Sequence, residues 1–172
     1  KQALLPKVAD GSLIGCIAVS EGPGEIKAGN IATRLKDGVI SGKKIPVTDG
    51  DIATHAIVLV KDGSGESLVI VDLTQSGVSR EPIKTLEPTR SHATISFDGA
   101  SAELLGEAGN GMALLDQIND RAAVLIAFEQ LGGASRCLEM ANDYAKERVA
   151  FGRAIGGNQA IKHKLADMYV KN

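Results

Sequence analysis

The stretch that decides the fold is residues 112–149, MALLDQINDRAAVLIAFEQLGGASRCLEMANDYAKERV. It lacks turn punctuation, and its apolar residues recur at spacings of three and four, so it predicts one long helix. The apolar stripe is too wide for a lone helix and predicts helical neighbours. Gly132 and Gly133 each cost about 1 kcal/mol against alanine, which indicates close helix packing or a kink there. The stripe comprises Met112, Leu115, Ile118, Ala122, Leu125, Leu138, Ala141, Tyr144 and Ala145.

A second helix is expected from about Asn158, with an apolar face at Ile161, Leu165 and Met168. This face is still intact at Asn172, where the sequence stops, and the sequence starts without a methionine. We therefore expect both ends of the chain to be cut.

Residues before Gly109 follow a different pattern, with short apolar or alternating runs separated by turn residues. Residues 36–38 and 62–65 supply the glycines and aspartates that tight hairpins need. We predict an α+β chain: an antiparallel β-barrel or sandwich followed by long antiparallel helices of a partial four-helix bundle. The predicted strands are 13–20, 28–35, 39–42, 56–61, 67–73, 93–97 and 102–105.

Composition excludes several classes of protein. Of the 172 residues, 44% are hydrophobic and 23% charged, which is typical of a globular chain, and the net charge of -2 argues against nucleic acid as a partner. No apolar run approaches the roughly 20 residues that span a bilayer, so membrane insertion is not expected. Cys16 and Cys137 lie far apart without metal-site spacing, which favours no metal and a reducing, cytoplasmic location.

The segment YAKERVAFGRAI, residues 144–155, is followed by NQAIKHKLADM, residues 158–168. This ordered string closely resembles the C-terminal helical domain of the acyl-CoA dehydrogenase family. Upstream, Leu5-Pro6 and Gly11 resemble the entry to that family's middle β-domain. The phrasing around residues 133–139 and 160–163 is most similar to bacterial members present in many copies, some of which act on steroid side chains or branched acids.

The resemblance implies that residues 1–106 are the middle β-domain and residues 107–172 the first part of the C-terminal helical domain. It implies FAD as cofactor, an acyl-CoA substrate, electron-transfer flavoprotein as electron acceptor, and a place in fatty acid β-oxidation. It further implies a tetramer or dimer in which a neighbouring subunit completes each flavin site. The family reaction removes an α proton with a base and transfers a β hydride to flavin N5.

The resemblance also implies cofactor-binding residues in the β-domain. Small hydroxyls at strand ends, such as those of Ser20 and Thr48, leave room for a flat ring, although alone they read as strand caps. The implied flavin contacts are Ile17, Ala18, Val19, Ser20, Glu21, Pro46, Val47 and Thr48.

In the helical half, Arg148, Phe151 and Gln159 match the residues that contact the FAD of an adjacent subunit. A guanidinium can form two parallel hydrogen bonds to a diphosphate, which a lysine cannot. Taken singly, the three would read as a surface ion pair with Asp143, a core aromatic and an ordinary first-turn residue.

The catalytic base is left unassigned, with Asp120 as the candidate. Asp120-Arg121 resembles a glutamate-arginine pair that a minority of members carry on the long helix, although its spacing to Arg148 is about two residues longer than the family's. Arg121 could instead contact the CoA phosphates. Most members keep their glutamate beyond the position where this sequence stops.

Three departures from the family pattern lie near the implied flavin site. Residues 22–25, GPGE, replace a glycine-serine-aspartate loop; Pro46 replaces a tryptophan; and Ala150 replaces a polar residue. They support an alternative hypothesis, that the chain is a supporting, flavin-poor subunit of a heterotetrameric acyl-CoA dehydrogenase. A second alternative is a non-catalytic β-barrel binding module.

Overall fold

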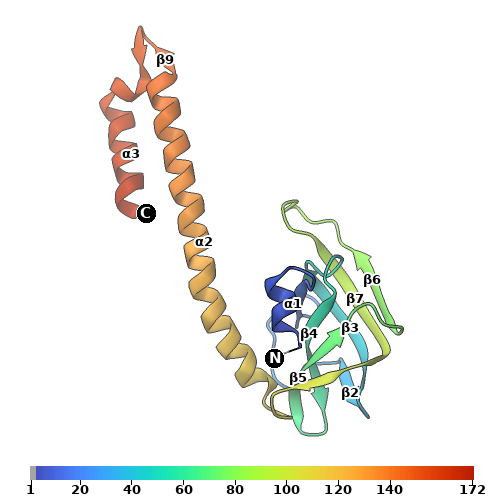
Figure 1. The fold of residues 1–172 in the computed structure, drawn as a ribbon. Coiled ribbons are helices and arrows are strands. Elements are labelled where there is room, and N and C mark those ends of the chain that lie inside the picture. Colours follow the sequence, from blue (N-terminus) through green and yellow to red (C-terminus); the bar gives the residue numbers. More distant parts are fainter. Residues whose placement is uncertain (1–2) are drawn as a thin grey trace. The chain divides into compact units, whose positions relative to one another are not determined.

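A computed structural model describes residues 3–172, which divide into two compact units with the boundary between Asp116 and Gln117 (Figure 1). The first unit is mostly sheet and the second helical, so the α+β fold expected from the sequence is confirmed. The division of domains at residues 106 and 107 stays a prediction; the sheet unit continues into the first turns of the long helix, where Leu115 is buried.

The first unit contains α1 (Leu5–Ala9) and eight strands in chain order. They are β1 (Gly15–Ala18), β2 (Arg34–Lys36), β3 (Val39–Thr48), β4 (His55–Asp62), β5 (Gly65–Asp72), β6 (Val78–Pro82), β7 (His92–Ser101) and β8 (Glu103–Leu105). The second unit follows with α2 (Gly111–Glu147), which begins in the first unit, then β9 (Val149–Ala150), β10 (Arg153–Ala154), the 3-10 turn η1 (Ile155–Gly157) and α3 (Gln159–Lys171).

The strands of the first unit form one sheet in the order β6-β7-β3-β2-β4-β5-β8, with β1 beside β4. Most neighbours are antiparallel, as predicted, but β1 pairs with β4 in parallel, Gly15 opposite His55, and β2 meets β4 in parallel at Arg34 and Lys61. Parallel pairing arises because a long connection separates β1 from β4 in the chain, whereas the antiparallel partners β2–β3 and β4–β5 are joined directly.

Both predicted hairpins are confirmed. Lys36 pairs with Val39 across a two-residue turn in which Asp37 and Gly38 have φ of 52° and 78°. Two successive positive φ values give a turn whose twist matches that of the flanking strands. The second hairpin pairs Asp62 with Gly65 in β4 and β5.

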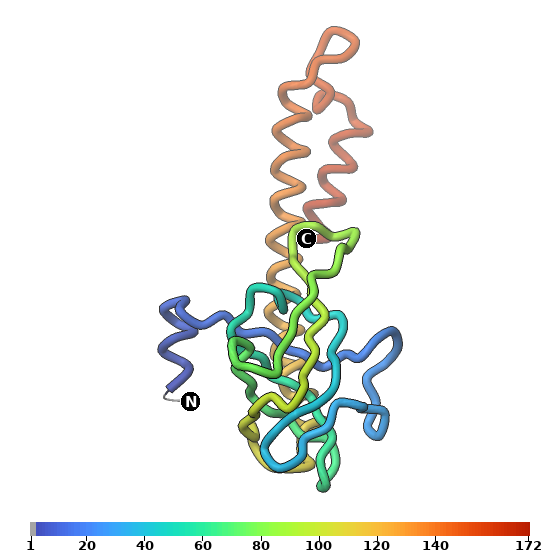
Figure 2. The backbone as a smooth tube through the Cα atoms, turned by 90° about the vertical axis from the view of Figure 1, so that its right-hand side faces the viewer, coloured from blue at the N-terminus to red at the C-terminus, as the bar shows by residue number. Residues whose placement is uncertain are grey.

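The core of the sheet unit is aliphatic. It draws side chains from β1, β3, β4, β5 and β7, so strands far apart in the sheet order share one interior. Figure 2 shows the chain curling around that interior. Its fully buried members include Ala18, Ile40, Val47, Val58 and Ile95.

Three strand predictions differ from the structure. Of the predicted range 28–35 only Arg34 and Leu35 lie in a strand, β3 continues beyond residue 42 to Thr48, and β6 was not predicted. Strand β6 is exposed along almost its whole length, so its residues carry no apolar alternation. The first two differences have a common cause in a buried carboxylate, described with the site below.

The helical unit confirms the predicted long helix and the second helix. Helix α2 runs unbroken through Gly132 and Gly133, and a Cβ added at either glycine would meet nothing within 4 Å. The close packing expected there is therefore not made within this chain. Helix α3 returns alongside α2 (Figures 1 and 2), where Asn172 Nδ2 donates to Ser135 Oγ at 3.3 Å.

Gly42 in β3 is the tightest backbone contact of the sheet that bears on the site. Its φ is 145°, and an added Cβ would lie 2.6 Å from Thr33 Cα and 2.9 Å from Thr33 Cβ. We expect Gly42→Ala to lower the free energy of unfolding by about 3 kcal/mol, because it adds both strain and overlap. Urea unfolding measures this. Gly63→Ala, where a Cβ meets nothing within 4 Å, is the control and should change stability by less than about 0.5 kcal/mol.

Candidate functional site

Two segments implicated by the sequence lie side by side in the sheet unit. The first is the end of β1 with the residues that follow it, 17–21, and the second is the end of β3, 46–48. Ile45 N–H donates to the Ser20 carbonyl at 2.8 Å, and Glu21 forms an isolated parallel bridge with Ile45. The structure thus brings together residues separated by about 25 positions in the sequence, and the backbone holds them.

The side chains of these segments alternate between core and surface. Ala18 and Val47 have no exposed surface, so only their backbone groups could meet a ligand. Ile17 is 43% exposed, and Pro46 and Thr48 are also exposed. The Ile45–Pro46 peptide is cis.

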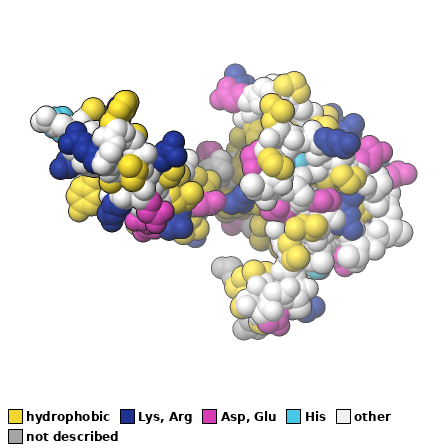
Figure 3. Space-filling model, turned by 90° about the horizontal axis from the view of Figure 1, so that it is seen from above, with side chains coloured by type: hydrophobic (Ala, Val, Ile, Leu, Met, Phe, Trp, Pro, Cys, Tyr) yellow, Lys and Arg dark blue, Asp and Glu magenta, His cyan; other side chains and the backbone are white. Residues whose placement is uncertain are grey.

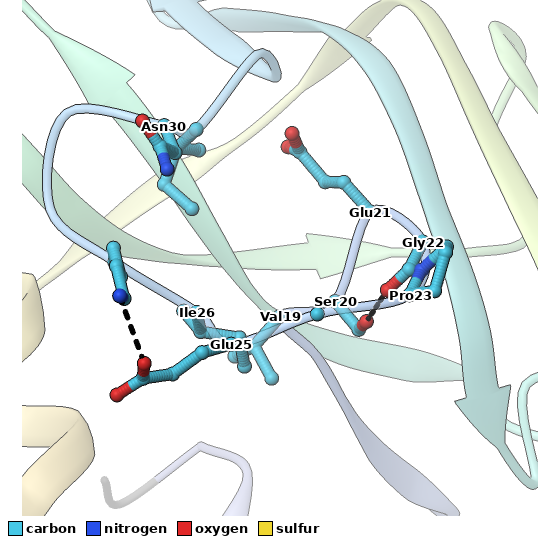
Figure 4. A pocket seen from close by; sticks show the side chains of 11 residues that line it. Val19, Ser20, Glu21, Gly22, Pro23, Glu25, Ile26 and Asn30 are labelled. Atoms are coloured by element: carbon cyan, nitrogen blue, oxygen red, sulfur yellow. Dashed lines mark hydrogen bonds and ion pairs between the residues drawn. The ribbon is translucent and has the colours of Figure 1, made fainter.

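A hollow of about 290 Å³ adjoins the first segment, lined by residues 19–27, 30 and 31 (Figure 4). Val19 and Ser20 are half-buried in its wall, and Ser20 Oγ donates to the Gly22 carbonyl at 3.0 Å. The hollow lies at the lower limit of ligand-sized clefts. The loop at residues 22–25, one of the departures from the family pattern, forms part of its lining.

Glu21 also lines this hollow, and its carboxylate accepts four hydrogen bonds from groups of the sheet unit. Its Oε1 accepts from Lys44 Nζ at 2.8 Å, from Thr33 Oγ1 at 2.7 Å and from Thr33 N at 2.9 Å. Its Oε2 accepts from Ala32 N at 2.7 Å. Figure 4 shows the carboxylate on the opposite side of the backbone from the Ser20 hydroxyl. The carboxylate therefore binds groups of the sheet unit itself, and only the backbone of Glu21 remains available to a ligand.

Lys44 was not singled out by the sequence. Its side chain has no exposed surface, and its ammonium donates to Glu21 and, at 3.2 Å, to the Val19 carbonyl. Along β3 the side chains of Ile40 and Lys44 are both buried and that of Lys43 is exposed, and the register shift between Lys44 and Val47 interrupts the alternation only after Lys44. The sequence predicted that this strand ends at residue 42, so Lys44 fell outside it.

The same network explains the strand predictions. Ala32 and Thr33 give their N–H groups to the Glu21 carboxylate where a strand would give them to a neighbouring backbone, so residues 28–33 are not a strand. Lys44 finds its partner inside the sheet, so β3 continues through residues that look like a surface turn.

Both charges have shifted pKa values. Burial acts to raise the pKa of Glu21, but hydrogen bonds from Lys44, Thr33 and two backbone N–H groups outweigh it and lower the pKa to about 2. Burial lowers the pKa of Lys44, and the Glu21 carboxylate opposes that shift. The pair is therefore an ion pair at neutral pH.

In the helical unit, Arg148, Phe151 and Gln159 are all exposed around a short hairpin. Arg148 follows α2, and its carbonyl accepts from Ile155 N at 2.8 Å, which closes the hairpin of β9 and β10. Phe151 is at the tip, fully exposed, with φ of 52°. Gln159 begins α3, and its Nε2 lies 3.5 Å from His163 Nε2. The structure thus gathers the three on one end of the unit.

A bulky aromatic residue in the left-handed region is unusual. The turn itself requires positive φ at both central residues, and Gly152 at 77° meets that requirement at no cost. Phe151 stores strain of about 1 kcal/mol without burying any of its ring in this chain.

Asp120 and Arg121 are both exposed on α2. Successive helical residues point about 100° apart, so the two side chains do not face the same site. Among residues 3–172, no three His, Cys, Asp or Glu side chains are grouped so as to hold a metal ion. No helix in this part of the chain has the length and apolarity to cross a membrane.

Comparison with known proteins bears on these observations. Residues 109–172 match the C-terminal domain of acyl-CoA dehydrogenases. Over 170 residues the chain is 35% identical to acyl-CoA dehydrogenase IpdE2 of Mycolicibacterium smegmatis, covering 99% of this chain and 49% of that protein. The chain belongs to the acyl-CoA dehydrogenase family.

Other acyl-CoA dehydrogenases agree. The chain is 35% identical over 182 residues to one of Bacillus subtilis, covering 98% of this chain and 48% of that protein. The crystal structure of an acyl-CoA dehydrogenase from Geobacillus kaustophilus superposes with a TM-score of 0.89 at 28% identity, covering 99% of this chain and 49% of that one. The chain thus spans about half the length of these relatives, and the resemblance read from the sequence is confirmed.

Glu21 predicts a pH dependence of stability. Because its pKa is depressed in the folded state, its contribution is fully present above about pH 5 and is lost as the pH falls towards 2. We expect the free energy of unfolding of the wild type to exceed that of Glu21→Gln by up to about 3 kcal/mol at neutral pH, and the difference to shrink towards zero at about pH 2.

Urea unfolding between about pH 2 and 7 measures this difference. Glu25→Gln is the control, because Glu25 is exposed and paired only with the exposed Lys27 at 3.0 Å. A difference between wild type and Glu21→Gln that does not vary with pH would contradict the depressed pKa.

Proposed function

We propose that this chain forms part of an FAD-dependent acyl-CoA dehydrogenase, which introduces a double bond between the α and β carbons of an acyl-CoA thioester. FAD, when bound, accepts the hydride. The observation that carries the proposal is the exposed group Arg148, Phe151 and Gln159, held around one hairpin in a chain 35% identical to an acyl-CoA dehydrogenase over 99% of its length.

The sheet unit would hold the isoalloxazine. Its two adjoining segments, 17–21 and 46–48, offer backbone groups and the Ser20 and Thr48 hydroxyls at neighbouring strand ends. Ser20 Oγ uses its proton on the Gly22 carbonyl and so would act towards a ligand as an acceptor. Pro46 can offer no N–H. These residues fit a flat ring approached mainly by backbone.

The helical unit would supply the second half of a flavin site in a neighbouring subunit. The exposed Arg148 guanidinium suits a diphosphate, since charge-assisted hydrogen bonds of this kind are short and strong. Contact with a neighbour's FAD would bury Phe151, which has no partner surface in its own chain. Oligomerisation, as a dimer or tetramer, is part of this proposal.

Substrate binding is assigned to Arg121, whose exposed guanidinium suits the CoA phosphates. Asp120 remains the candidate base in this chain, although it points away from Arg121 along α2. Electron-transfer flavoprotein as acceptor, a role in fatty acid β-oxidation and a cytoplasmic location belong to the same proposal.

A second candidate is the supporting subunit of a heterotetramer. It is favoured because two of the three departures from the family pattern, the loop at residues 22–25 and Pro46, concern the sheet half of the flavin site. The hairpin carries one departure, Ala150 in β9, and keeps Arg148, Phe151 and Gln159. Purifying the full-length protein alone and with a co-expressed partner separates the two: stoichiometric flavin absorbance in the lone protein excludes the supporting role.

Arg148→Ala should weaken FAD binding by the assembled protein by roughly 10- to 100-fold, the cost of losing charge-assisted hydrogen bonds. Arg148→Lys should recover only part of this, because an ammonium cannot bond in two parallel directions. Titration with FAD, followed by flavin fluorescence, measures the effect. Arg136→Ala is the matched control: Arg136 is exposed on α2, the helix that Arg148 follows, and pairs with Glu139 at 2.9 Å. Equal losses in both variants would contradict the assignment.

Phe151→Asn should separate stability from function. Asparagine tolerates positive φ, so the variant relieves the strain and should raise the free energy of unfolding of the single chain by up to about 1 kcal/mol. It should also weaken FAD binding or assembly, because the aromatic contact is lost. Thermal unfolding and the FAD titration are compared on the same preparation; a variant with unchanged FAD affinity and assembly would show that Phe151 has no external contact.

A further inference from the structure

The ion pair Glu21–Lys44 is buried at the junction between the two segments of the candidate flavin cradle. Lys44 has no exposed side-chain surface and Glu21 is 18% exposed, at a distance of 2.8 Å. Taking two charges out of water is costly, and well-packed apolar residues of similar size are often as stabilising as a buried pair. A gain in stability is therefore a weak explanation for the Glu21–Lys44 pair, and its location between the two segments suggests a different role.

The pair binds both segments at once. The Lys44 ammonium, carried by β3, donates to the Val19 carbonyl at 3.2 Å, one residue before Ser20. The Glu21 carboxylate, one residue after Ser20, accepts from Lys44, two residues before Pro46. Between them, the Ile45 N–H donates to the Ser20 carbonyl at 2.8 Å. Ser20 is thus fixed from both sides relative to the strand that carries Pro46 and Thr48.

The rest of the network makes the position specific. Glu21 is held by three further hydrogen bonds, from Thr33 N, Thr33 Oγ1 and Ala32 N. Thr33 is itself fully buried, its carbonyl accepts from Lys61 N at 2.8 Å, and Gly42 packs against it with no room for a Cβ. The carboxylate therefore cannot shift without disturbing two strands.

We propose that Glu21 and Lys44 are positioning residues, which set the relative placement of segments 17–21 and 46–48 and thereby shape the flavin cradle. This inference rests on the proposed function. It assigns Glu21 a role through its internal carboxylate rather than through contact with the cofactor, and it adds Lys44, which approaches the cradle from inside the sheet.

The test uses the full-length protein with FAD as the probe. Lys44→Met removes the donor to Val19 and leaves the Glu21 carboxylate without its counter-charge, whereas the double variant E21Q/K44M leaves no buried charge and retains an amide oxygen that can accept from Thr33. Lys43→Met is the matched control, since Lys43 is the exposed neighbour on the same strand. Each protein is measured for FAD affinity, thermal unfolding and backbone hydrogen exchange.

We expect the double variant to unfold near the wild-type temperature, yet to bind FAD at least 10-fold more weakly and to exchange the Ile45 N–H at least 10-fold faster. Exchange in β5, none of whose residues bonds to Glu21, Lys44 or Thr33, should be unchanged. Lys44→Met should show the same losses together with a lower unfolding temperature, and Lys43→Met should resemble the wild type. If the pair had a purely structural role, Lys44→Met would lose stability and FAD affinity together, and the double variant, which keeps its stability, would bind FAD like the wild type.

Three results would overturn the inference. One is wild-type FAD affinity in E21Q/K44M, another is unchanged exchange at Ile45, and the third is loss of FAD affinity only in proportion to lost stability. A wild-type protein that binds no FAD, alone or with a partner subunit, overturns the proposed function itself. A wild type that binds FAD with variants that bind it equally well overturns the positioning role alone.

Discussion

The ion pair between Glu21 and Lys44 is the constraint that fixes the end of β1 against β3 in the sheet unit. It joins the end of β1 to β3 and, through Thr33, to the segment that leads into β2. Removing one partner alone would leave an uncompensated charge inside the sheet, which typically costs 3–5 kcal/mol, as an order of magnitude. The end of β1, strand β3 and the segment before β2 are thus joined by one network of charged hydrogen bonds, so a shift of one would disturb the other two.

This interaction also marks the limit of what the sequence could predict. Helix α2, helix α3 and both hairpins followed from local patterns, because a helical period and a turn with positive φ are written in neighbouring residues. The course of residues 28–33 and the length of β3 were decided by Glu21 and Lys44, which meet across 23 positions. Local sequence places Lys43 and Lys44 outside the predicted strand 39–42. Lys44 is buried because its ammonium bonds to Glu21, a partner that no local pattern reveals.

The candidate site divides in the same way. Its residues were identified from a family resemblance, and the structure shows which groups of each are available: backbone at Ala18 and Val47, side chains at Ile17 and Thr48. Inward-facing positions contribute to the fold and outward-facing ones to a ligand, so a single strand serves both purposes. Glu21 lies at the boundary, because its neighbour Ser20 lines a hollow while its own carboxylate holds the sheet together.

The helical unit leaves much of its apolar surface unburied. Large apolar side chains remain exposed on both helices, and Figure 3 shows hydrophobic side chains at the surface among lysines and arginines. Burying the Phe151 ring alone would return roughly 2–3 kcal/mol, more than the strain of about 1 kcal/mol that its backbone stores. The exposed large apolar side chains on helices α2 and α3 are Val124, Leu125, Ile126, Phe128, Leu131, Met140, Tyr144, Met168, Tyr169 and Val170. No contact within the described residues offsets this strain, so burial of the ring against another surface would stabilise the hairpin conformation.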